Sequence, residues 1–163
     1  MKIFNCSRRY VETRRAELEA DGGLFVISIN GFYKDDSGEI RNDIPPINHK
    51  NRLALWFDDA TDSDVVNVDI VKIFDRKMAF NILEEIECAF KNKDIKHILV
   101  HCSAGMSRSA AISTALNDFL NVVLSDNKAD WEHNKKHGFE VPPIPNAYIL
   151  ATMRAIIREN VWK

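Results

Sequence analysis

The sequence has few cysteines and no long apolar run. It contains three cysteines, Cys6, Cys88 and Cys102, among 163 residues. This odd and small number fits free thiols in a reducing compartment better than a disulfide framework. No segment approaches the roughly 18 consecutive apolar residues that a membrane-spanning helix needs, and residues 1–6 turn polar too early for the apolar core of a secretory signal. The sequence therefore predicts a cytoplasmic protein with free thiols.

A large charge of either sign is also missing. The 22 basic and 24 acidic residues give a formal net charge of -2. Without a basic field, neither nucleic acid nor a membrane surface is expected as a partner, and any anion must be bound locally. A chain of this length with 45% hydrophobic residues is expected to form one domain, residues 1–163, with one active site. We assume a monomer.

Short apolar runs alternate with helical patterns, without an internal repeat, and this alternation predicts an α/β fold. We expect a central, mostly parallel sheet of four to five strands flanked by helices. The polar segment 30–50 is expected to be a long surface loop that could border a site. The expected strands are 2–6, 23–29, 52–57 and 96–101, and the expected helices are 8–20, 75–90, 108–120, 131–137 and a last one that begins at residue 146.

The most informative feature lies between the expected strand 96–101 and the helix that follows it. Residues 101–109 read His-Cys-Ser-Ala-Gly-Met-Ser-Arg-Ser. A turn of this length at a helix N-terminus directs successive backbone N–H groups, together with the positive end of the helix dipole, at an anion. We call residues 102–108 the cysteine loop, and we expect its members Ser103, Ala104, Gly105, Met106, Ser107 and Arg108 to bind phosphate.

Two side chains of the cysteine loop are expected to carry the chemistry. The field that holds a phosphate also favours a thiolate at Cys102, which could attack phosphorus and form a covalent intermediate that water then hydrolyses. The planar guanidinium of Arg108 can bind two phosphoryl oxygens at once, as a lysine could not. Ser109 is expected to donate to the sulfur and His101 to help hold the loop. The reaction needs neither a metal nor a cofactor.

The segment 101–109 resembles the signature of the cysteine-based protein tyrosine phosphatase superfamily, which is His-Cys, five residues, Arg and then Ser or Thr, with glycine three positions after the cysteine. The order of elements is most similar to the small dual-specificity-like branch, including predicted tyrosine phosphatases of bacteria and phages. The resemblance implies a phosphatase domain that acts on phosphorylated protein or peptide. Phosphoinositide or RNA 5′-phosphate hydrolysis, and a phospho-binding module without turnover, remain as alternatives.

The family also uses an aspartate upstream of the cysteine as general acid. The candidates here are Asp58, Asp59, Asp62, Asp64 and Asp69. A residue just after a strand faces the same edge of the sheet as the cysteine loop, which favours Asp58 or Asp59, and the family pattern selects Asp59. The spacing from Asp59 to Cys102 is longer than is usual in small dual-specificity enzymes, so either the segment 60–72 contains an insertion or Asp69 is the acid.

Two further features of the sequence lie outside the cysteine loop and the candidate acids. His133 and His137 are four residues apart and could share a helix face, but a third metal ligand is not evident and two lysines stand between them. We therefore predict no metal site. Cys88 lies on the helix before the strand that leads to Cys102. It is expected to pack in the core, and the alternative is a protective disulfide with an oxidised Cys102.

Overall fold

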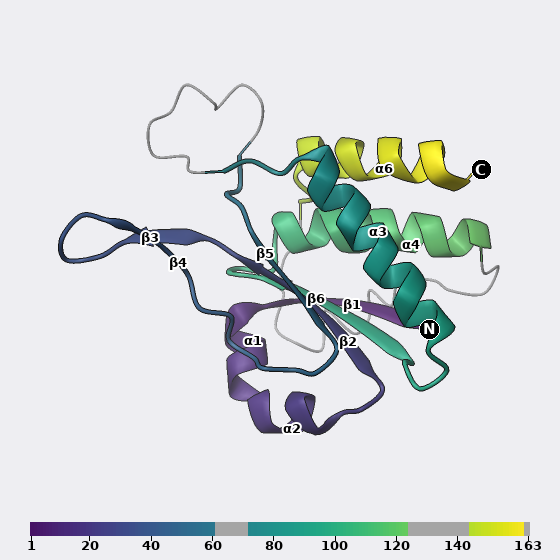
Figure 1. The fold of residues 1–163 in the computed structure, drawn as a ribbon, viewed down its shortest axis with the longest axis horizontal. Helices are drawn as coiled ribbons and strands as arrows, with labels where there is room; N and C mark the ends of the chain where they lie inside the picture. The colour runs from purple at the N-terminus through teal and green to yellow at the C-terminus, as the bar shows by residue number, and fades with distance from the viewer. Residues whose placement is uncertain (61–71, 124–143, 162–163) are drawn as a thin grey trace.

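The computed structural model describes residues 1–60, 72–123 and 144–161, and its centre is a four-stranded sheet (Figure 1). The strands run in the order β1-β6-β2-β5, and every neighbouring pair is parallel. The predicted α/β class and parallel central sheet are therefore confirmed, with four strands. The strands are β1 (Lys2–Ser7), β2 (Leu24–Asn30), β5 (Arg52–Trp56) and β6 (His97–Cys102).

The register of the sheet brings the carboxyl ends of its strands to one edge. Ser7 at the end of β1 pairs with Cys102 at the end of β6, and Ser28 near the end of β2 pairs with His101. All seven residues of β2 are buried, as expected of a central strand that is covered on both faces. Residues just after β1, β2 and β5 therefore surround the start of the cysteine loop.

Helices cover both faces of the sheet (Figure 1). On one face, α3, α4 and α6 contribute to the larger apolar core, and on the other a smaller core includes Val11 of α1. Asp75 caps α3 as predicted, because its carboxylate accepts the Met78 N–H at 2.7 Å. The helices are α1 (Arg8–Thr13), α2 (Arg15–Ala20), α3 (Arg76–Lys91), α4 (Arg108–Val123) and α6 (Ala147–Val161).

The single helix predicted over residues 8–20 is wrong, because the helix is interrupted at Arg14. The backbone of Arg14 has φ −110° and ψ 19°, which separates α1 from α2. Just before this point, the Thr13 hydroxyl donates to the carbonyl of Arg9 at 2.8 Å. Such a bond competes with the main-chain ladder and often bends a helix.

The segment 30–50 is not a simple loop, because it contains the hairpin of β3 (Phe32–Lys34) and β4 (Ile40–Asn42). One carboxylate oxygen of Asp35 accepts hydrogen bonds from the backbone of Ser37 and Glu39. Gly38 supplies the positive φ, 81°, that the turn requires. The hairpin extends away from the sheet (Figure 1).

Two other predictions concern the helix at 131–137 and the absence of a membrane-spanning segment. The helix predicted at 131–137 lies outside the described residues. Within the described residues, no helix has both the length and the apolar character needed to cross a lipid bilayer. This finding agrees with the absence of a long apolar run in the sequence.

Candidate active site

The cysteine loop joins the end of β6 to the start of α4, as the sequence predicts. Cys102 is only 3% exposed. Its Sγ atom accepts the Gly105 N–H at 3.2 Å and lies 3.1 Å from Oγ of the buried Ser109. Two donors can therefore stabilise a negative charge on this sulfur, and the N-terminus of α4 adds the favourable end of its dipole.

The loop is held in shape by β1 and by the residue that follows it. Asn5 Nδ2 donates to the carbonyl of Gly105 at 2.8 Å, and the Arg8 N–H donates to the carbonyl of Ser103 at 3.1 Å. Gly105 has a φ of 75°, and a Cβ atom there would lie 2.6 Å from the carbonyl carbon of Cys6. The close approach to β1 therefore requires glycine at position 105.

Arg108 lies at the start of α4 with its guanidinium held by three acceptors. Nη1 donates to the carbonyl of Phe57 at 2.7 Å and makes a long contact of 3.5 Å with the carbonyl of Asn30. Nη2 donates to Ser103 Oγ at 3.1 Å. Nε–H has no acceptor among the described residues, so this donor and the remaining N–H of Nη2 can bind two oxygens of one phosphoryl group.

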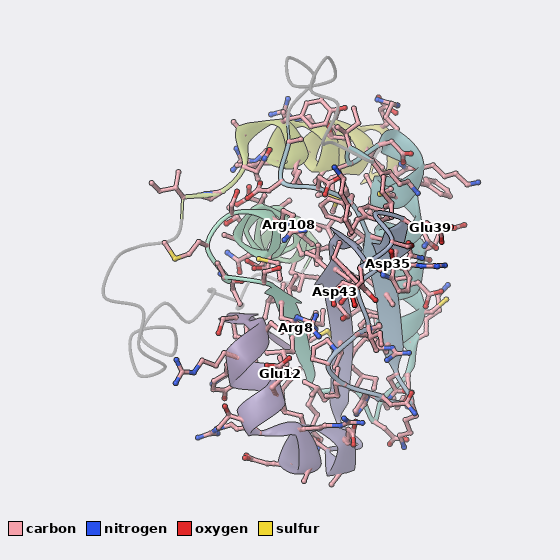
Figure 2. The ribbon with its side chains drawn as sticks, turned by 90° about the vertical axis from the view of Figure 1, so that its left-hand side faces the viewer. Arg8, Glu12, Asp35, Glu39, Asp43 and Arg108 are labelled. Atoms are coloured by element: carbon pink, nitrogen blue, oxygen red, sulfur yellow. The ribbon has the colours of Figure 1, made fainter. Side chains whose placement is uncertain are left out.

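A second arginine, Arg8, lies beside this site with its charge already compensated. Figure 2 shows Arg8 next to Asp43, with Arg108 close by. The Arg8 guanidinium bonds to Glu12 at 2.7 Å, to the carbonyl of Ile44 at 2.9 Å and to the Asp43 carboxylate. Its side chain therefore ties the base of the hairpin to α1, and its positive charge is shared between two carboxylates.

Asp59 is the candidate acid that the structure brings to the cysteine loop. Its exposed carboxyl accepts, on Oδ1, the Ser107 hydroxyl at 2.8 Å and Asn146 Nδ2 at 2.9 Å. Asp58 is used differently, because its carboxylate accepts the Lys72 N–H at 3.0 Å and its own N–H donates to the Lys72 carbonyl at 2.7 Å. The other candidates, Asp62, Asp64 and Asp69, lie outside the described residues.

His101 is buried beneath the loop and makes no hydrogen bond through its ring within the described part of the chain. The bonds that hold the loop come instead from Asn5 and Arg8, which the sequence did not single out. Burial, and then the nearby positive charge of Arg8, lower the pKa of His101 to about 3. The ring is therefore neutral at physiological pH, and its contribution to the loop is one of packing.

The two remaining cysteines differ in their surroundings. Cys88 is exposed on α3, so the prediction that it packs in the core is wrong. The buried face of α3 consists of residues such as Ile82 and Ile86, and Cys88 lies on the solvent side with the glutamates. Cys6 is buried on β1, where burial and then the proximity of Cys102 raise its pKa, so that it remains a neutral thiol.

Comparisons with protein-family models, with curated proteins and with solved structures gave no match. Any proposal on function therefore depends on the sequence of residues 101–109 and on the arrangement of the site itself. Within the described residues no group of three or more His, Cys, Asp or Glu side chains could hold a metal ion. The pair His133 and His137 lies outside those residues. Among the described residues, the site contains a thiol with two donors, a guanidinium with N–H groups that none of these residues accepts, and a carboxyl at the edge of the same loop.

Proposed function

We propose that the chain is a phosphate monoester hydrolase of the protein tyrosine or dual-specificity phosphatase type. The observation that carries this proposal is the surroundings of Cys102 Sγ, which receives the Gly105 N–H and faces the Ser109 hydroxyl at the N-terminus of α4. A buried thiol that only filled the core would not require such donors. With Arg108 on the same loop, the arrangement suits a nucleophile and a phosphoryl group held side by side.

The reaction takes two steps. In the first, the Cys102 thiolate forms a bond to phosphorus while the bond from phosphorus to the ester oxygen breaks, and Asp59 gives its proton to the leaving oxygen. In the second, water attacks the cysteinyl-phosphate, Asp59 takes a proton from it, and the bond from sulfur to phosphorus breaks. Inorganic phosphate leaves and the thiolate is restored. Arg108 stabilises the charge on the equatorial oxygens in both steps.

A single phosphate is the best match to the charges around the loop. The side chains between Cys102 and Arg108 are all neutral. Arg8, the second cation beside the loop, already shares its charge with Glu12 and Asp43. Among the described residues, a substrate with several phosphates, such as a phosphoinositide or an RNA 5′-phosphate, would meet few free cations here. The resemblance of residues 101–109 to the tyrosine phosphatase signature supports phosphotyrosine in protein as the substrate.

Replacement of the nucleophile tests this proposal. We expect Cys102→Ser to abolish hydrolysis of p-nitrophenyl phosphate and to leave binding of a phosphotyrosine peptide intact, because Arg108 and the loop N–H groups remain. Cys88→Ser is the matched control, since it removes an exposed thiol on α3 and should not change turnover. Turnover that survives in Cys102→Ser would overturn the mechanism. Peptide binding by a parent protein without any turnover would instead identify a phospho-binding module.

The class of substrate requires a separate measurement. Peptides of one sequence that carry phosphotyrosine, phosphoserine or phosphothreonine should be compared by the release of inorganic phosphate, together with a phosphoinositide. We expect the highest kcat/KM for phosphotyrosine. Preference for the phosphoinositide would contradict the argument from the neutral loop.

A further inference from the structure

Asp59 receives two hydrogen bonds on the same carboxylate oxygen. Ser107 Oγ and Asn146 Nδ2 both donate to Oδ1, at 2.8 and 2.9 Å. One donor belongs to the cysteine loop and the other lies just before α6, so two parts of the chain that are distant in sequence meet at this oxygen. No described residue donates to Oδ2. The two oxygens of the carboxyl are therefore in different surroundings.

Asn146 is itself fixed in orientation. Its side-chain Oδ1 accepts the Ile149 N–H at 3.1 Å, which makes Asn146 the N-cap of α6, and its own N–H donates to the carbonyl of Ser107 at 3.3 Å. Because the amide oxygen is used by the helix, the amide nitrogen must face Asp59. Ile149 and Met153 bury α6 in the core, and α6 lies beside α4 (Figure 1). The donor is thus attached to a well-anchored helix.

We propose that Asn146 is a positioning residue for the general acid, acting together with Ser107. This inference rests on the proposed function. With Oδ1 occupied by two donors, the proton of the acid is carried on Oδ2, the oxygen to which no described residue donates, and from there it can pass to a leaving group. The closed set of bonds among Asp59, Ser107 and Asn146 also holds the carboxyl at the loop before substrate binds, so the acid needs no large movement to reach its place.

Two substitutions separate this role from the capping of α6. Asn146→Ser and Asn146→Asp both keep an oxygen that can cap the helix, but neither keeps the amide donor. The aspartate also places a second carboxylate against Asp59, which repels it. Asp75→Ser is the control, because Asp75 caps α3 in the same way and its side chain makes no described contact with the cysteine loop. Thermal unfolding of each variant checks that the fold is kept.

The readout is the dependence of kcat/KM on the leaving group. A phenyl phosphate or phosphotyrosine substrate needs the proton of the acid, whereas 2,4-dinitrophenyl phosphate releases a phenolate that is stable without one. Because a general acid contributes roughly 10²- to 10⁴-fold, we expect both Asn146 variants to lose about tenfold or more with phenyl phosphate and little with the dinitrophenyl ester.

The double variant Asp59→Ala with Asn146→Ser completes the test. If Asn146 acts only through Asp59, the double variant should be no slower than Asp59→Ala alone. Equal losses with both esters, or additive losses in the double variant, would overturn the positioning role while leaving the phosphatase proposal intact. Absence of Cys102-dependent turnover in the parent would overturn the proposed function and this inference with it. The Asp75→Ser control should keep the parental ratio of the two rates.

Discussion

Replacing Gly105 with alanine tests how closely the cysteine loop must approach β1. A Cβ atom at this position would lie 2.6 Å from the carbonyl carbon of Cys6 and 2.7 Å from the amide nitrogen of Ser7. Both atoms belong to the main chain, so no change of rotamer can relieve the overlap. The loop and β1 must therefore move apart for the variant to fold.

The expected loss of stability has two parts. A left-handed backbone costs a residue other than glycine about 1–2 kcal/mol, and overpacking typically costs about 1–3 kcal/mol. We therefore expect Gly105→Ala to lower the free energy of unfolding by about 2–5 kcal/mol. Separation from β1 also moves the Gly105 N–H away from Cys102 Sγ. A hydrogen bond to a charged group contributes about 1.5–3 kcal/mol, so turnover should fall about tenfold or more.

Gly38→Ala is the matched control. Gly38 has a similar φ of 81°, but a Cβ atom there would meet nothing within 4 Å. We expect the free energy of unfolding of this variant to fall only by the cost of the left-handed backbone, about 1–2 kcal/mol. Its turnover should equal that of the parent. Urea unfolding of both variants measures the difference, and p-nitrophenyl phosphate measures the rate. Equal stability of the two variants, with parental turnover in Gly105→Ala, would refute the claim that the loop depends on this contact.

Two further predictions concern side chains beneath the loop. The pKa of His101 is about 3 in the folded chain and about 6.5 in an unfolded one, so between these values only the unfolded chain takes up the proton. The free energy of unfolding should therefore fall as the pH drops below 6.5, by about 1.4 kcal/mol per pH unit from this ring. Between pH 7 and pH 5, urea unfolding should show a smaller drop in the free energy of unfolding for His101→Gln than for the parent. An equal drop in the two proteins would contradict the lowered pKa of His101. Ser109→Ala should slow release of the thiolate in the second step, so rapid mixing should reveal a burst of nitrophenol; a linear time course would count against this role.

The core of the site could be predicted because its elements are local in sequence. The strand that ends at Cys102 is apolar at its centre, and the helix that begins at Arg108 has a regular apolar face. The loop between them is therefore fixed by its two neighbours. Asp59 lies beside the cysteine loop because it comes shortly after the parallel strand β5, and this position in the chain is visible in the sequence.

The residues that support the loop could not be predicted in the same way. Asn5 and Arg8 contact a loop about a hundred positions away, and this contact depends on β1 being the neighbour of β6. Strand order is decided by packing across the whole sheet, and the apolar pattern of a single strand does not predict which strands lie beside it. Two local errors had other causes. A side-chain bond at Thr13 precedes the interruption of the first helix, and the turn residues around Asp35 were strong enough to form a hairpin.

The pair of hydrogen bonds between Asp58 and Lys72 has a consequence for how this chain can change its length. These bonds join the two ends of the intervening segment, and Asp59 is held beside the cysteine loop by Ser107 and Asn146, which lie outside that segment. Doubling the length of such a closed segment costs only about 0.6 kcal/mol of chain entropy. Insertions and deletions between Ala60 and Lys72 should therefore be tolerated without displacing the carboxyl. The long interval between Asp59 and Cys102 counts residues along the chain and does not measure their separation in space.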